Sequence, residues 1–473
     1  MNRTVTGRLP GEEPPKVSGR ISIPASKSHT IRALLIAAFA SGESRLRRPL
    51  VSRDSLSCRQ AVEALGARVI DDGPDWVVQG FGSRPSPAGE APVSIDVGNS
   101  GTTLYLAAAL AALSETPIRF DGDEQIRRRS AAPLLDALKA MGAEVEASDG
   151  GCAPFTVRGP LKAGTVAVDC PVSQYLSALL LAAPLISPPA GGKASSLRQP
   201  ASADENAPDR GAASELSASE VSTIKVNTLN EAPYAGITLD WLDDGGIEYE
   251  RDGWDEFRVP AGQSYRAFDK VVPADWSSAT FFLAAAAVTG GTLILEGLDY
   301  SDSQGDKAVL DMLAEMGCET QAGEGRVKIT GKPMKGAVLD LNATPDALPA
   351  MAVVACFAEG ETRLVNVPQA RLKETDRIAV MTSELLKLGV DAEELPDGMI
   401  IRGRRPGSFR CDSPVIKGAV VDGHDDHRVV MALAVAALGG CGEVSIRGAE
   451  AADVTFPGFF ELLDKALGKG GRE

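Results

Sequence analysis

Apolar residues along this chain gather in alanine-rich stretches, each preceded by a polar cluster and followed by a turn and a short β-branched run. The alanine-rich stretches predict helices, and the β-branched runs predict strands. The spacing between these stretches is about 70 to 80 residues, with one interval of about 100. Six of them recur, opening at Ser26, Asn99, Ser173, Asp275, Pro345 and His424.

A second helix is predicted between several of the copies. It ends in Leu-Gly or Met-Gly near Leu65, Met141, Met316 and Leu388. Each unit therefore reads helix, strand, helix, strand. Because this period exceeds that of the common solenoids, we expect three units in each of two domains. A chain of 473 residues suits two domains, and its few aromatic residues favour an α/β or α+β fold.

The long interval contains a low-complexity segment from 187 to 220 that is rich in Ser, Ala, Pro and Gly. Such a segment buries too little apolar area to order itself. We interpret it as a disordered insertion without a catalytic role.

The formal net charge of −16 makes the chain repel nucleic acid and anionic membranes, so neither is expected as a partner. An anionic ligand would need cations gathered locally at one site. The scattered cysteines contain no CxxC pair and are expected to be reduced. No apolar run is long enough for a leader peptide or a membrane span, which predicts a cytoplasmic protein.

Each alanine-rich helix begins with residues that cap free backbone N–H groups. Any one start is explained by ordinary capping. Six starts with added Lys, Arg or His would form an anion site if the helices were parallel. In the first, Ser28 and Arg32 lie one turn apart beside Lys27. That motif alone fits an anion site and a solvated helix cap equally well, and it is not a P-loop because no GxxxxGK[ST] precedes it.

Several motifs in order and spacing resemble the 5-enolpyruvylshikimate-3-phosphate synthase family of enolpyruvyl transferases. They are Pro-Ala-Ser-Lys-Ser at Pro24, Asn-Ser-Gly-Thr at Asn99, Ser-Gln at Ser173, Pro-Asp-Ala at Pro345, Lys-Glu-Thr-Asp-Arg at Lys373 and Asp-His-Arg at Asp426. The resemblance covers nearly the whole chain. The motifs at Lys373 and Asp426 are its most specific part.

The resemblance implies a two-domain inside-out α/β barrel, with three βαβαββ-like units in each domain and a cleft that closes on substrates. It implies a first domain at 24–265 and a second formed by 1–23 with 266–473. Phosphoenolpyruvate and shikimate 3-phosphate are the implied substrates. No metal or organic cofactor is implied, and a monomer is expected.

The same resemblance assigns the site residues. Positions that hold phosphoenolpyruvate are matched by Lys27, Gly101, Arg129, Arg377 and Arg428. Positions around shikimate 3-phosphate are matched by Ser28, Arg32, Ser173, Gln174, Tyr234, Asp346 and Lys373. A side chain at position 101 would intrude on the small substrate. His427 is expected to hydrogen-bond within the site.

The implied reaction adds the ring 5-hydroxyl to C2 of phosphoenolpyruvate and then eliminates phosphate. Asp346 is expected to accept the hydroxyl proton, and Glu374 is expected to exchange a proton with C3. Lys27 would assist at the leaving oxygens.

Five positions depart from the family pattern. Tyr105 replaces an arginine, Val172 and Glu231 replace serines, Gln369 replaces an asparagine, and Val454 replaces a lysine. The exchange at Glu231 affects the expected contact with the 3-phosphate, and that at Val454 the contact with phosphoenolpyruvate.

Three alternatives stay open at this point. The departures favour a paralogue that uses another acidic acceptor, or that binds without turnover. A UDP-N-acetylglucosamine enolpyruvyl transferase would share the fold, but the stretch 113–122 lacks the cysteine usual there. His424 and His427 have the spacing of metal ligands, although the chain holds only one other histidine.

Overall fold

The computed structural model describes residues 1–9, 12–87, 92–188, 220–404 and 414–469. The predicted insertion lies almost entirely outside these residues. The described chain divides into two compact units. Unit 1 comprises Met1–Thr30, Pro49–Leu56 and Val272–Glu473, and unit 2 comprises Ile31–Arg48 and Ser57–Val271. The domain boundaries expected from the sequence stay a prediction.

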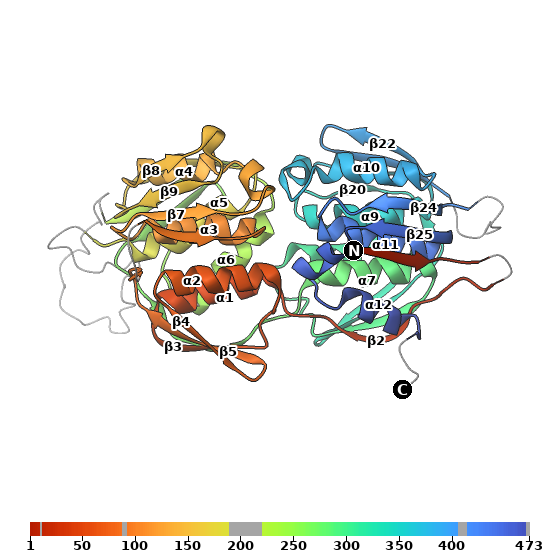
Figure 1. The fold of residues 1–473 in the computed structure, drawn as a ribbon, viewed down its shortest axis with the longest axis horizontal. Coiled ribbons are helices and arrows are strands. Elements are labelled where there is room, and N and C mark those ends of the chain that lie inside the picture. Colours follow the sequence, from red (N-terminus) through yellow and green to blue (C-terminus); the bar gives the residue numbers. More distant parts are fainter. Residues whose placement is uncertain (10–11, 88–91, 189–219, 405–413, 470–473) are drawn as a thin grey trace, which may run out of the picture. The chain divides into compact units, whose positions relative to one another are not determined.

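The predicted helices are present in both units (Figure 1). The alanine-rich series consists of α1 (Lys27–Phe39), α3 (Gly101–Ala111), α5 (Gln174–Ala182), α7 (Trp276–Thr289), α9 (Leu348–Cys356) and α11 (His427–Gly439). A second series consists of α2 (Arg53–Ala64), α4 (Ala132–Ala140), α6 (Ala232–Asp244), α8 (Ala308–Met316), α10 (Arg377–Lys387) and α12 (Phe459–Ala466).

Unit 2 contains three sheets among its described residues. In the first, β3 (Ala40–Arg47) and β5 (Asp75–Phe81) pair, flanked by β4 (Arg68–Asp72), β14 (Tyr265–Arg266) and β15 (Asp269–Val271). The second has the order β6 (Val93–Asp96), β7 (Ile118–Asp121), β9 (Phe155–Arg158) and β8 (Glu144–Ala147). The third has the order β10 (Thr165–Cys170), β11 (Val221–Leu229), β13 (Glu256–Pro260) and β12 (Glu250–Asp252).

Unit 1 likewise contains three sheets in the part of the chain that is described. The first has the order β17 (Glu319–Gly323), β18 (Arg326–Thr330), β16 (Thr292–Glu296) and β2 (Ser18–Ser22). The second has the order β19 (Met334–Lys335), β21 (Ala358–Val365), β23 (Gly398–Gly403) and β22 (Asp391–Leu395), with β20 (Val338–Asp340) beside β21. The third has the order β1 (Asn2–Thr6), β25 (Cys441–Arg447) and β24 (Lys417–Asp422).

One connection pattern repeats through these sheets. In the repeat that starts at β6, α3 connects the parallel strands β6 and β7, and α4 then leads to the antiparallel hairpin β8–β9. A parallel pair needs a crossover, which the alanine-rich helix supplies. In the last repeat of the chain, β24 and β25 are parallel, and the N-terminal β1 pairs antiparallel with β25. The predicted βαβαββ-like unit is therefore confirmed.

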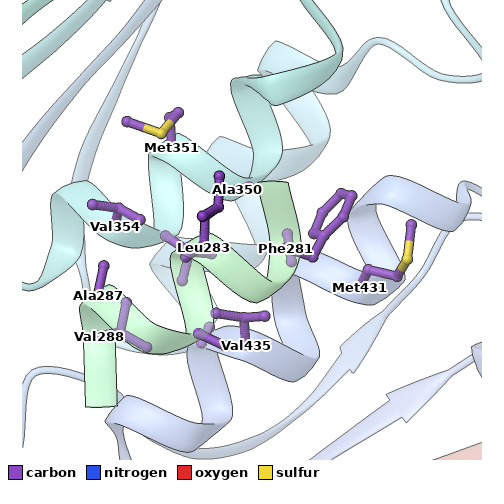
Figure 2. Packing of buried hydrophobic residues seen from close by; sticks show 14 of the residues in the cluster. Phe281, Leu283, Ala287, Val288, Ala350, Met351, Val354, Met431 and Val435 are labelled. Carbon is purple, nitrogen blue, oxygen red and sulfur yellow. The ribbon is translucent and has the colours of Figure 1, made fainter. Parts of the chain in front are cut away.

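The alanine-rich helices form the core of each unit because they are buried on all sides. In unit 1, α7, α9 and α11 pack together, and Figure 2 shows Leu283 of α7, Val354 of α9 and Val435 of α11 within this cluster. In unit 2, α3 packs beside α5 (Figure 1). Alanine lets helix backbones approach closely, so the core is filled at high density with few aromatic side chains.

A glycine at the end of the hairpin recurs against the C-terminal end of the alanine-rich helix. A Cβ atom at Gly80 would lie 2.2 Å from the carbonyl oxygen of Ala40, and one at Gly159 would lie 1.8 Å from that of Ala112. Gly331 and Gly403 meet the ends of α7 and α9 in the same way, each at 2.1 Å. These glycines let the hairpin backbone approach the C-terminal end of each helix closely, because a side chain there would meet a carbonyl group.

Candidate active site

The N-terminus of α11 carries the Asp-His-Arg motif. Asp426 is the N-cap, and its Oδ1 accepts a hydrogen bond from the backbone N of Arg428 at 2.9 Å. The preceding turn holds His424 and Asp425 in the left-handed region, with φ of 51° and 54°. Such a conformation costs on the order of 1 kcal/mol for each non-glycine residue. The turn therefore needs support from its surroundings.

Arg377, the first residue of α10, is completely buried among three carboxylates. Its Nε donates to Asp426 at 2.8 Å, its Nη1 donates to Asp346 at 2.8 Å, and its Nη2 donates to Glu374. Burial alone would lower the pKa of Arg377, but Asp426, Glu374 and Asp346 raise it above the usual value. The guanidinium is permanently charged and joins both predicted catalytic carboxylates.

Asp346 lies between two arginines. Its Oδ2 is 2.8 Å from Nη2 of Arg428, which also donates to Ser277 Oγ at 3.1 Å. Burial alone would raise the pKa of Asp346, but Arg428, Lys373 and Arg377 lower it well below the usual range. Asp346 is therefore ionised at neutral pH.

Lys27 opens α1 and pairs with a buried carboxylate, because its Nζ lies 2.9 Å from Asp54 Oδ2. Burial would lower the pKa of Lys27, but Asp54, Glu374 and Asp346 raise it above its ordinary value. Ser26 supports this helix start by accepting a hydrogen bond from His29 N at 3.4 Å. The lysine is held as a cation beside the carboxylate network.

His427 is buried beside Arg428, and within the described residues its Nε2 atom has no hydrogen-bond partner. Burial lowers the pKa of His427 to about 3, with Glu374 opposing that shift and Arg428 adding to it. The imidazole is therefore neutral and presents an unoccupied nitrogen.

In unit 2, Arg32 is buried and hydrogen-bonded to neutral groups. Its Nε donates to Thr238 Oγ1 at 2.7 Å, and its Nη2 donates to Tyr234 O at 2.8 Å and Ser177 Oγ at 3.2 Å. Burial lowers the pKa of Arg32 to about 10, with Tyr234 acting in the opposite direction. The cation remains charged at neutral pH.

Ser173 at the start of α5 lies beside the start of α6. Its Oγ donates to Glu231 Oε2 at 3.2 Å, and both side chains are buried. Glu231 is the N-cap of α6, with a left-handed φ of 58°. Within the described residues, the neighbouring Gln174 Oε1 is a buried acceptor without a partner. The structure thus places an acidic side chain among the predicted acceptor-binding residues.

The start of α3 is arranged around Gly101. A Cβ atom at this position would lie 2.7 Å from Arg129 Nη1 and 3.7 Å from the ring of Tyr105. Tyr105 packs edge-on against Tyr175 with ring centroids 5.0 Å apart. Tyr175 donates its hydroxyl to Ser130 O at 2.6 Å. Gly101 therefore leaves space for the Arg129 guanidinium.

The predicted residues fall into separate groups. In unit 1, the Arg377 network joins Asp346, Glu374 and Arg428, while the charges of Lys27 and Lys373 act on it; Ser28 lies in the first turn of α1. Unit 2 groups Arg32 with Tyr234, Ser173 with Gln174 at the start of α5, and Gly101 with Arg129. The residue set as a whole stays a prediction.

Sequence reasoning missed several partners of these residues. Asp54 belongs to no motif, and Ser277 lies in the repeat that opens at Asp275 but has no role predicted from it; both contacts arise from packing. Asp426 stands inside the Asp-His-Arg motif and could have been recognised as an N-cap. Gln369 is buried and donates to Asn342 O at 2.9 Å, while Val454 ends the short helix Ala449–Val454.

The contacts of His424 and His427 differ from those expected of two ligands of one metal ion. Its Nε2 lies 2.7 Å from Oε1 of Glu384, whereas the Nε2 of His427 has no partner among the described residues. In the described part of the chain, no group of His, Cys, Asp or Glu is arranged to hold a metal ion. No described helix combines the length and apolar character that crossing a membrane requires.

The chain matches known proteins in both sequence and fold. The family described as EPSP synthase (3-phosphoshikimate 1-carboxyvinyltransferase) matches residues 12–191 and 213–463. The chain belongs to the EPSP synthase family. This confirms the resemblance seen in the sequence.

Relatives of this EPSP synthase family member match over nearly their full length. A 3-phosphoshikimate 1-carboxyvinyltransferase from Ruminiclostridium cellulolyticum is 45% identical over 454 residues, covering 96% of this chain and 97% of the relative. One from Halobacterium salinarum is 39% identical over 459 residues, covering 95% and 96%. The EPSP synthase structure from Acinetobacter baumannii has a TM-score of 0.75, 24% identity and 98% coverage of both chains. The predicted fold class is therefore confirmed.

Proposed function

We propose that this chain transfers the enolpyruvyl group of phosphoenolpyruvate to the 5-hydroxyl of shikimate 3-phosphate and releases phosphate. This is the activity named for its family and for relatives that span the whole chain. The observation that carries the residue assignment is the buried network in which Arg377 binds both Asp346 and Glu374. We further propose that the protein is cytoplasmic and monomeric; light scattering on purified protein tests its oligomeric state, and cell fractionation tests its location.

The network supplies fixed charges for anionic substrates. Lys27, Lys373, Arg377 and Arg428 are its cations, and Asp54, Asp346, Glu374 and Asp426 are its carboxylates. With four of each, the group is balanced before substrates bind. A phosphate or carboxylate that binds to Arg428 competes with Asp346 for the guanidinium.

This competition changes the pKa of Asp346, the proposed base. The pKa of Asp346 is lowered by Arg428, Lys373 and Arg377, which keeps the group ionised but weakly basic. A substrate anion beside those cations offsets their effect and raises the pKa of Asp346. The carboxylate then gains the basicity needed to accept the proton of the 5-hydroxyl.

The second carboxylate, Glu374, exchanges protons with C3 of phosphoenolpyruvate. Glu374, fixed by Arg377, takes up a proton from solvent as the anionic substrates bind, donates it to C3 during addition and takes a methyl proton back during elimination. The bond between C2 and the phosphate oxygen then breaks, and phosphate leaves with the proton that Asp346 took from the hydroxyl, while Lys27 stabilises its charge. General acid and base steps of this kind contribute about 10²- to 10⁴-fold each. Holding two substrates in place contributes a further large factor.

The decisive assay combines purified protein, phosphoenolpyruvate and shikimate 3-phosphate, and follows phosphate release. Phosphate equal to the enolpyruvyl product is expected, with none when either substrate is omitted. Tight binding of both substrates without phosphate release would contradict the proposal.

A second candidate is transfer to another acidic acceptor. It is favoured by the buried Glu231 beside Ser173, because a carboxylate there repels a phosphate. Replacing shikimate 3-phosphate by shikimate in the same assay separates the two. Higher kcat/KM with the unphosphorylated acid would support this second candidate.

A further inference from the structure

The residues before α11 form a turn in a strained conformation. The backbone N of Asp426 donates to Gly423 O at 2.9 Å, and the two residues between them, His424 and Asp425, both have positive φ. This is the geometry of a type I′ turn, which Gly, Asn and Asp adopt most readily. A histidine in this turn therefore needs contacts that hold it.

Those contacts come from Glu384 of α10, whose carboxylate is completely buried. Its Oε1 lies 2.7 Å from His424 Nε2, and its Oε2 accepts from the backbone N of Asp422 at 3.1 Å. Both oxygens thus bind the segment that enters the turn. Asp422 Oδ1 in turn accepts from His424 N at 2.8 Å.

The same helix also holds the segment after the turn. Arg377 binds Asp426 through Nε at 2.8 Å and through Nη2 at 3.2 Å. Arg377 and Glu384 are seven residues apart, so they lie on one face of α10, two turns from each other. One rigid helix face therefore grips the turn at both ends.

We propose that Glu384 and His424 are positioning residues that set the register of Asp426 and Arg428 relative to Arg377. They act on the site through the turn. This inference rests on the proposed function, because it matters for catalysis only if Arg428 and Arg377 bind substrate. Losing the grip at Glu384 lets the turn relax and moves the Arg428 guanidinium away from Asp346.

The burial of Glu384 supports a role beyond packing. A buried carboxylate is costly unless its oxygens are hydrogen-bonded, so an apolar residue would serve better if only volume mattered. Lys387 also contacts Oε1, at 2.6 Å, but its side chain is 46% exposed and approaches from outside the turn. It therefore offers a matched control on the same carboxylate.

The test compares steady-state kinetics of Glu384→Ala, Glu384→Gln, His424→Asn and Lys387→Ala with the unmodified chain. Because displacement of a catalytic group by about 1 Å costs up to about 100-fold, Glu384→Ala is expected to lower kcat/KM for phosphoenolpyruvate by about 10- to 100-fold. Glu384→Gln can keep an acceptor toward the backbone N of Asp422 and turn its amide NH2 toward His424 Nε2, which then accepts, so it should restore most of this loss. His424→Asn tolerates the turn but cannot reach Glu384, and about a 10-fold loss is expected.

Lys387→Ala should leave kcat/KM within about twofold, because Lys387 approaches Glu384 from outside the turn and its loss leaves both contacts of Glu384 with the turn in place. Equal kcat/KM in all four variants, with a lower melting temperature in Glu384→Ala, would reduce Glu384 to a structural role and overturn the inference. If Glu384→Ala does not fold, the comparison of Glu384→Gln with His424→Asn decides, since the inference requires a larger loss in His424→Asn.

Failure of the proposed function can be distinguished from failure of the inference about Glu384 and His424. If the unmodified chain releases no phosphate, that proposal fails alone, and calorimetric titration with phosphoenolpyruvate takes the place of kinetics. A weaker dissociation constant in His424→Asn than in Lys387→Ala then supports the inference. Equal constants, or no binding to the unmodified chain, overturn it.

Discussion

The predicted site residues of the two units are held in different ways. In unit 1, buried charges hold one another, as Arg377 does with Asp346, Glu374 and Asp426. In unit 2, the buried Arg32 is held by hydroxyls and a backbone carbonyl of Thr238, Ser177 and Tyr234.

This difference indicates different tasks for the two sets of residues. Mutually compensating charges can change their protonation while staying in place, which suits acid and base steps. Hydroxyl and carbonyl groups that accept hydrogen bonds from a cation give it a fixed direction, which suits ligand binding. We therefore expect substitutions in unit 1 to affect turnover most, and those in unit 2 to affect KM most.

The largest effect is expected for Asp346→Asn, which tests the chemical task of unit 1. Asparagine keeps the shape beside Arg377 and Arg428 but cannot accept the proton of the 5-hydroxyl. A loss in kcat of about 10²- to 10⁴-fold is expected, with the fold intact. Phosphate release measures the first, and far-UV circular dichroism the second.

The exposed Asp311, which accepts from the Tyr300 hydroxyl, provides the control for that variant. Asp311→Asn should retain full activity. Near-normal kcat in Asp346→Asn would remove Asp346 as the base and would weaken the contrast between the units.

Arg377→Met tests whether the charges of unit 1 hold one another. Removing this buried cation takes a partner from three buried carboxylates, of which Asp346 keeps Arg428, so the free energy of unfolding should fall by about 3–5 kcal/mol. Urea denaturation at neutral pH measures it. Part of the loss should return at low pH, where the carboxylates take up protons.

Arg402 is a matched control, because it also contacts three carboxylates, those of Glu361, Asp391 and Glu393, but is 43% exposed. Arg402→Met should lower the free energy of unfolding far less, because exposed ion pairs contribute little. Equal losses in both variants would show that burial is not what makes the Arg377 network strong.

Much of this arrangement was predictable from local sequence. The alanine-rich repeats gave the helices and their starts, because burial on all sides leaves a pattern in each stretch. The motifs gave Asp346, Arg377 and Arg428 through the family resemblance. Their mutual contacts were not predictable from local pattern, since Arg377 lies 31 residues from Asp346 and 49 from Asp426.

Other features depend on tertiary packing and left no local signal. Asp54 pairs with Lys27 across 27 residues, and no motif surrounds it. Glu231 is buried because the starts of α5 and α6 meet, 58 residues apart in sequence. The glycine contacts behind the alanine-rich helices arise from backbone approach, which the hydrophobic pattern does not encode.

Gly101→Ala tests the binding task of unit 2. A Cβ atom there would meet Arg129 Nη1 at 2.7 Å, so the guanidinium must move. The KM for phosphoenolpyruvate should rise by about 10-fold or more, because a displaced cation no longer faces its ligand. Stability should hold, since a flexible side-chain end gives way and alanine favours the helix.

Gly164 is the control for that substitution, because a Cβ atom there would meet nothing within 4 Å. Gly164→Ala should leave KM unchanged. A fall in kcat without a change in KM for Gly101→Ala would contradict a binding role for this part of unit 2.

His427 extends the comparison of the two units to the pH dependence of stability. Its pKa of about 3 in the folded chain lies below its ordinary value of 6.5, so folding favours the neutral form. The unfolded chain takes up this proton as pH falls below about 6.5, and stability is lost by about 1 kcal/mol per pH unit down to the folded pKa. His427→Gln should show a smaller loss between about pH 6.5 and pH 4.5, measured by urea denaturation.

The two curves share every other titrating group, so their difference isolates His427. Parallel curves would mean that the imidazole gains a proton in the folded chain and is not held neutral. The acid and base steps would then have a third participant in unit 1.

The smallest effect is expected for Glu231→Gln, which removes a buried acidic charge from unit 2. Glutamine keeps the contact with Ser173 Oγ but lifts the repulsion on an anionic acceptor. The KM for shikimate 3-phosphate should fall by about 3- to 10-fold, while the KM for phosphoenolpyruvate stays constant. Glu124→Gln is the control, since Glu124 is a highly exposed carboxylate of the same unit. A rise in the acceptor KM would instead mean that Glu231 binds the acceptor, and unit 2 would then select a group other than phosphate at this position.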